Sequence, residues 1–144
     1  MTDIAVYTVQ EQAENLSWDL STPQNPGHRV SGTIDVTLFT AAQHFPNGFI
    51  PSGTVLGKVT ATGLLGPYLD AATDGRQTAV GYLAASTQVL QPNGTSKGKV
   101  GAAVLVAFAP VSVSKLPLTS GTAAAGGYID ANGQADLKNI YHAA

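Results

Sequence analysis

The three histidines of this chain are the residues best suited to binding a metal or moving a proton, but their spacing argues against both roles. His28, His44 and His142 each stand alone, with no second histidine or carboxylate three or four residues away. Pairs at that spacing are what a helix needs to present two ligands on one face. A metal site would therefore require the three to converge in the fold. We expect each to be a surface or interface residue, and we expect no metal and no cofactor.

A glycine-containing segment at residues 53–59, GTVLGKV, has a superficial likeness to a phosphate-binding loop. It fails in two ways: three residues separate the glycines where the motif has four, and Val59 replaces the hydroxyl residue that would hold magnesium. The chain has many hydroxyl groups, but nucleophilic catalysis needs one that a neighbouring base activates. The segment is better explained as a bulged strand, and we expect no catalysis from it.

Residues 127–130, GYID, resemble part of the dUTPase motif, in which an aspartate lies near the deoxyribose. The likeness ends there, because the phosphate-binding segment and the glycine-rich C-terminal arm of dUTPases have no counterpart, and Arg29 and Arg76 are the only arginines. Asp130 is better explained as the first residue of an Asp-Ala-Asn-Gly turn. We expect the protein not to be an enzyme; a dUTPase-like β-clip enzyme is the least favoured alternative.

Composition indicates a surface that other chains cover. Charged residues make up 11% of the chain, against about 25% in a typical domain. Either threonine, serine, asparagine, glutamine and glycine supply the surface polarity, or other subunits cover much of the uncharged surface, and we favour the second explanation. The formal net charge of −2 and the pI of 5.8 leave no basic stripe for phosphates, so we expect no direct contact with nucleic acid.

Other bulk properties limit the class of protein further. Cysteine is absent, which rules out disulfides and thiolate zinc sites. No apolar run reaches the ~20 residues that a membrane helix requires, and residues 100–110 are the most apolar stretch. The first residues are acidic and lack the basic-then-apolar pattern of a secretion signal. We expect no membrane association, and retention in the cytoplasm where the chain is made.

The sequence predicts a mainly β domain preceded by an extended arm. Residues 4–9, IAVYTV, are β-prone, and residues 21–27, STPQNPG, are a turn-rich linker. We expect residues 1–30 to form an extended N-terminal arm, with an ordinary edge strand plus loop as the alternative, and residues 31–144 to form a single β-rich domain. Strands are expected within residues 33–39, 54–62, 78–90, 100–108 and 111–113, and one short helical turn within residues 134–140.

Residues 49–81 combine turns with short β segments. Pro51 and Gly53 favour a tight turn. Gly57 interrupts a β-branched run, as a bulge or a close backbone approach would. Gly66-Pro67 is a dipeptide typical of turns, and we expect a turn there.

The same block ends in a second turn signal, Asp74-Gly75. Gly75 is expected to supply a positive φ. Arg76 is expected to pair with Asp70 or Asp74, to bond to loop carbonyls, or to contact a neighbouring subunit. We favour a structural role within the protomer.

This block resembles the head decoration (capsid cement) proteins of tailed bacteriophages, the lambda-type family. The likeness rests on residues 49–57, FIPSGTVLG, on Gly66-Pro67-Tyr68 and on residues 71–77, AATDGRQ, and is weak at both ends of the chain. It implies a bent β-ribbon fold, β-clip or β-tulip-like, with at most one or two short helices, assembled as a homotrimer. It also implies trimers bound to the major capsid protein at threefold or quasi-threefold positions on the outer surface of the expanded head, stabilising the virion against internal DNA pressure.

The arm suggests how such a protein could bind its shell. Ile4, Val6, Tyr7 and Val9 could add a strand to an exposed sheet edge of the major capsid protein. Trp18 could be an anchor, because tryptophan is enriched among interface hot spots, but a buried core tryptophan fits the sequence equally well. A trimeric virion attachment or fibre module is the alternative function, although the repeats and long coiled coils usual in fibres are absent.

Overall fold

The structure, a computed structural model, describes residues 14–24, 26–91, 94–119 and 124–143. The predicted class, a mainly β domain with at most two short helices, is confirmed. The strands are β1 (His28–Asp35), β2 (Phe49–Ile50), β3 (Val55–Lys58), β4 (Leu65–Pro67), β5 (Ala79–Leu83), β6 (Thr87–Gln88), β7 (Lys99–Ala107), β8 (Pro110–Ser112) and β9 (Tyr141–Ala143). The α-helices are α1 (Ala41–His44) and α2 (Ala131–Asp136), and the 3-10 turns are η1 (Val36–Leu38) and η2 (Val113–Lys115).

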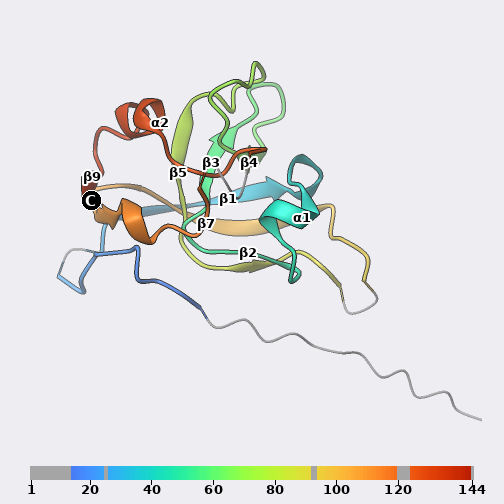
Figure 1. Cartoon of the computed structure of the whole chain (residues 1–144), viewed down its shortest axis with the longest axis horizontal. Coiled ribbons are helices and arrows are strands. Elements are labelled where there is room, and N and C mark those ends of the chain that lie inside the picture. The colour runs from blue at the N-terminus through green and yellow to red at the C-terminus, as the bar shows by residue number, and fades with distance from the viewer. Residues whose placement is uncertain (1–13, 25, 92–93, 120–123, 144) are drawn as a thin grey trace, which may run out of the picture.

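The main sheet closes into a barrel with the strand order β1-β4-β3-β5-β7 (Figure 1). The longest pairing is between β1 and β7, which run antiparallel from His28 opposite Ala107 to Asp35 opposite Lys99. The barrel closes on its other side through a parallel contact between Ile34 of β1 and Leu65 of β4. The sheet is thus closed, where the family resemblance implied a bent β-ribbon.

Apolar side chains pack on both faces of the barrel sheet. Because successive residues of a strand point to opposite faces, neighbouring residues of three strands join different clusters. Val55, Tyr82 and Leu105 belong to one buried cluster, and Leu56, Leu83 and Val104 belong to the other. β3, β5 and β7 therefore each carry two consecutive apolar residues, as expected of strands that are buried on both faces.

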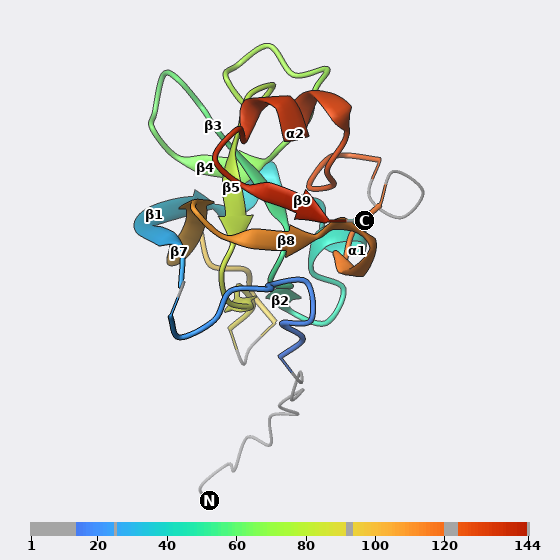
Figure 2. The ribbon, with the colours of Figure 1, turned by 90° about the vertical axis from the view of Figure 1, so that its left-hand side faces the viewer.

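Two small sheets and α2 complete the domain. β2 pairs with β6 in the antiparallel sense, and β8 pairs with β9 in the parallel sense. Figure 2 shows β8 and β9 side by side below α2. The side chain of Asp130 caps α2 by accepting a hydrogen bond from the Gly133 N–H at 2.8 Å. The turn expected from residue 130 is thus the start of this helix, which begins earlier than the sequence predicted.

Two elements differ from the sequence predictions. The strand expected over residues 33–39 ends at Asp35, because the Asp35 carboxylate accepts the Thr37 N–H at 3.1 Å and starts η1. Residues 41–48 contain α1, which was not predicted. The strands expected over residues 100–108 and 111–113 are confirmed to within one residue as β7 and β8.

The expected division at residue 30 is also wrong for the part of the arm that the structure describes. The boundary falls inside β1. Ahead of β1, the Glu14 carboxylate accepts the Ser86 N–H at 3.0 Å, and Asp19 forms an antiparallel bridge with Val111. The domain therefore includes the chain from residue 14. Ile4, Val6, Tyr7 and Val9 lie outside the described residues.

Candidate functional site

The residues that carry the family resemblance meet where two segments of the chain cross. A Cβ atom placed on Gly57 of β3 would lie 2.7 Å from both the Cα and the carbonyl oxygen of Arg76. A Cβ on Gly66 of β4 would lie 2.8 Å from the Cδ of Arg76. The register of β3 against β5 also shifts between Leu56 and Gly57. The predicted bulge and close approach at Gly57 are confirmed, and glycine is required there for space.

The Asp74-Gly75-Arg76 turn is locked by its own side chains. The Asp74 carboxylate accepts hydrogen bonds from the Arg76 backbone N–H at 3.1 Å and from Arg76 Nε at 2.9 Å. These bonds, the backbone one foremost, lower the pKa of Asp74. Gly75 has a φ of 115°, and a Cβ there would lie 2.5 Å from the Lys58 carbonyl oxygen. The predicted positive φ and the pairing of Arg76 with Asp74 are confirmed.

The other two predicted turns have different outcomes. Gly53 has a φ of 89°, and the Thr54 hydroxyl donates to the Pro51 carbonyl at 2.8 Å, which confirms the turn at Pro51 and Gly53. The turn expected at Gly66-Pro67 is wrong, because both residues lie in β4 and are buried. Glycine occurs at position 66 because the Leu38 and Arg76 side chains leave no room for a Cβ.

Trp18 is a core residue and not a free anchor. Its side chain is fully buried, its ring centroid lies 5.7 Å from that of Tyr82, and its Nε1–H donates to Ser52 Oγ at 3.2 Å. Of the two alternatives that the sequence left open, the structure has the buried one. Trp18 therefore cannot bind a capsid partner without unfolding part of the domain.

His44 is buried, which corrects its expected place at a surface or interface. Its Nδ1 accepts the Thr40 N–H at 2.8 Å, so its Nε2 carries the proton and donates to the Gly126 carbonyl at 2.9 Å. Burial lowers the pKa of His44, and the Thr40 N–H occupies the lone pair that a second proton would need. His44 thus joins α1 to the segment before α2 as a neutral ring.

The remaining histidines give no catalytic or metal-binding cluster. His142 Nε2 lies 2.9 Å from the Tyr82 hydroxyl, and burial lowers the pKa of His142. His28 is exposed in β1. In the described ranges there is no group of three histidine, cysteine, aspartate or glutamate side chains placed to hold a metal ion.

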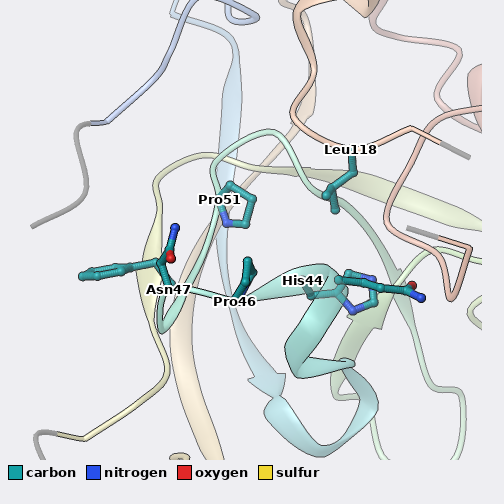
Figure 3. A pocket seen from close by; sticks show the side chains of 7 residues that line it. His44, Pro46, Asn47, Pro51 and Leu118 are labelled. Atoms are coloured by element: carbon teal, nitrogen blue, oxygen red, sulfur yellow. The ribbon is translucent and has the colours of Figure 1, made fainter. Parts of the chain in front are cut away.

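A small pocket lies beside His44. Its volume is about 180 Å³. The pocket is lined by Gln43, His44, Pro46, Asn47, Phe49, Pro51 and Leu118. Figure 3 shows Asn47 on one side, His44 and Leu118 on the other, and Pro46 and Pro51 between them. Both ring nitrogens of His44 are already engaged, and the Gln43 Oε1 accepts the Ala125 N–H at 3.0 Å. The pocket therefore offers neither an available base nor a nucleophile.

Ser96 is the centre of a G-x-S-x-G sequence at residues 94–98, the pattern that presents a nucleophile in some hydrolases. In those enzymes the serine occupies a sharp turn from a strand into a helix. Here Ser96 forms an isolated bridge with Leu90, in the connection between β6 and β7. The pattern occurs in a different structural context and does not indicate a nucleophile.

Asp130, the residue of the dUTPase comparison, is held by structural bonds. Its Oδ1 accepts the Gly133 N–H and the Tyr68 hydroxyl, both at 2.8 Å. Burial and the neighbouring Asp130 carboxylate raise the pKa of Tyr68, so the phenol stays protonated as the donor. These contacts are consistent with Asp130 as the cap of α2.

Phe108 and Tyr141 are the most exposed of the large apolar side chains in the described residues, and both lie beside β8, a feature that the sequence did not predict. We call Leu20, Phe108, Pro110 and Tyr141 the aromatic patch. The Leu20 N–H donates to the Pro110 carbonyl at 3.1 Å, and Tyr141 pairs with Pro110 from the other side. Phe108 is 65% exposed and Tyr141 is 72% exposed. An open hollow of about 490 Å³ lies among Phe108, Ala109, Pro110, Asn139 and Tyr141.

Within the described part of the chain, no helix has the length and apolar character needed to cross a bilayer. Comparison of the chain with protein-family models, with curated proteins and with solved structures finds no match in any of the three.

Proposed function

We propose that this chain is a capsid decoration protein. In this proposal it binds the outer surface of the expanded bacteriophage head as a homotrimer, at threefold or quasi-threefold positions, and stabilises the head against the pressure of packaged DNA. The observation that carries the proposal is the block at residues 49–81, whose likeness to the lambda-type decoration family extends over its turns and β segments. Gly57, Gly66 and Arg76 of that block pack closely together.

The chemistry of the described residues agrees with a binding role. The motif residues Asp74 and Arg76 bond to each other, and the aspartate of the dUTPase-like segment caps a helix. The chain is poor in charge, and the large apolar side chains of Phe108 and Tyr141 are mostly exposed. These features suit contact with other protein chains better than the turnover of a small substrate.

Stabilisation would follow from selective binding. A protein that binds only the expanded lattice shifts the equilibrium toward that lattice by mass action. Three binding segments in one trimer add avidity when their spacing matches that of the lattice. Ile4, Val6, Tyr7 and Val9 are the proposed binding segment, adding a strand to a sheet edge of the major capsid protein. Trp18 is not part of it, because it belongs to the core.

The test compares the full chain with a chain that begins at residue 14, which retains Glu14 and Trp18 and every described strand. Each is mixed with empty expanded heads, and with unexpanded heads as the control, and binding is measured by co-sedimentation. We expect the full chain to bind expanded heads only, and the shortened chain to keep its fold and lose binding. Equal binding by the shortened chain would rule out the arm, and no binding by the full chain would overturn the proposal.

A further inference from the structure

We propose that the aromatic patch is the contact between copies of this chain. The patch consists of Leu20, Phe108, Pro110 and Tyr141, of which the last three line the hollow described above. The inference takes from the proposed function only the number of copies, three. It does not depend on whether those copies bind a phage head.

Phe108 is the first argument, because its strained backbone presents an apolar ring to solvent. Its φ is 61°, and among the non-glycine residues of the described ranges Phe108 alone has a positive φ. A bulky side chain is strained in this left-handed region of the backbone. The ring nevertheless remains mostly in solvent. Backbone strain that presents an aromatic ring outward is readily explained when another molecule buries the ring.

The patch is held rigidly by hydrogen bonds between separate segments. The Phe108 N–H donates to the Asn139 carbonyl at 2.7 Å, and the Tyr141 N–H donates to the Ala109 carbonyl at 3.3 Å. β8 and β9 pair through Pro110 and Tyr141. Such pre-ordering lowers the entropy lost on association, so little of the binding energy is spent on fixing the backbone. The hollow between the two rings can receive a side chain of the neighbouring copy.

Charge and area favour a second copy as the occupant. No charged residue belongs to the patch or lines its hollow, so copies can meet there without like-charge repulsion. Permanent homomeric contacts are the more apolar class of interface. With three copies the patches would meet around one axis, and the two rings of each copy would bury on the order of 250 Å², about a third of the ~800 Å² that each partner gives to a standard interface. That amount suits the centre of a subunit contact with an ordinary polar rim.

The test uses the full chain, without heads, and measures mass by sedimentation and by light scattering over a roughly hundredfold range of concentration. The variant is Phe108→Asn with Tyr141→Thr. Asparagine tolerates a positive φ and threonine suits a strand, so the variant should melt no lower than the wild-type monomer. The matched control is Val30→Thr, which removes an exposed apolar side chain from β1, away from the patch.

We expect the wild type and the Val30→Thr control to associate alike, and the double variant to need at least about a hundredfold higher concentration. A wild type that stays monomeric throughout, or a double variant that associates as the wild type does, would overturn the inference. Head binding is measured separately. A trimer that depends on the patch but binds no head would therefore leave this inference standing and remove the proposed function.

Discussion

Gly57 and Arg76 show at the scale of single residues why a glycine can be required inside a strand. The backbone of Arg76 crosses β3 so closely that any side chain at position 57 would meet main-chain atoms, which cannot rotate away. We predict that Gly57→Ala lowers the free energy of unfolding by about 1–3 kcal/mol, as overpacking in a core does. Denaturant unfolding would measure the change.

The matched control is Gly101→Ala in β7, where a Cβ would meet no atom within 4 Å. We expect this variant to change the free energy of unfolding by no more than about 0.5 kcal/mol. If the two variants had equal effects, the close approach at Gly57 would not be the cause.

His44 gives a prediction for the dependence of stability on pH. Because burial lowers the pKa of His44 below its usual 6.5, the unfolded chain binds a proton at a higher pH than the folded chain does. As far as His44 is concerned, the free energy of unfolding should therefore not change with pH well above 6.5. It should fall as the pH drops through 6.5 toward the lower pKa that His44 has in the folded protein. His44→Gln, whose amide can accept from Thr40 and donate to Gly126, should reduce this slope.

The measurement is denaturant unfolding of both proteins in steps from neutral pH to about pH 5, above the range in which most carboxylates titrate. Part of the slope should persist in His44→Gln, because burial also lowers the pKa of His142. An identical slope in the two proteins would show that His44 does not titrate differently in the folded and unfolded states.

At the scale of elements, the segment before β1 is the part whose role changes most between sequence and structure. Trp18 packs against Tyr82 and donates a hydrogen bond to Ser52, so this segment is part of one of the two cores. We predict that Trp18→Ala lowers the free energy of unfolding by about 3–5 kcal/mol. Urea unfolding of the chain beginning at residue 14 would measure it.

Leu16→Ala is the control for this element, because Leu16 is 46% exposed two residues away. We expect it to cost less than about 0.5 kcal/mol. If Trp18→Ala lowered the free energy of unfolding only slightly, this segment would instead be the loosely attached arm that the sequence suggested.

Local patterns predicted much of the sheet, and long-range packing decided the rest. The β-branched runs identified β3, β5 and β7, and the glycine at position 57 was recognised as a close approach. Gly66-Pro67 failed as a turn because both residues pair with β3, Gly66 opposite Gly57 and Pro67 opposite Leu56. The buried His44 and the exposed Phe108 were missed because their partners, Gly126 and Asn139, lie far away in the sequence.

At the scale of the whole molecule, the low charge has a measurable consequence. The net charge is −2, and the aromatic patch contains no ionised group. We predict that association between copies changes by less than about threefold from about 0.05 to about 0.5 M salt, because there are few exposed charges to screen. Sedimentation at several salt concentrations would measure it. A fall of several orders of magnitude would indicate a contact driven by charge.

The pairing of β1 with β7 governs how fast the domain can form. These strands are more than sixty residues apart in the chain, yet they make the longest ladder of the barrel. The chain between the two strands must close into a loop, at a cost in entropy, before the hydrogen bonds of the ladder can form. Refolding from denaturant is therefore expected to be slow for a domain of this size, on the order of milliseconds to seconds. Until β7 arrives, β1 is an unpaired edge on which chaperones or a neighbouring nascent chain can act.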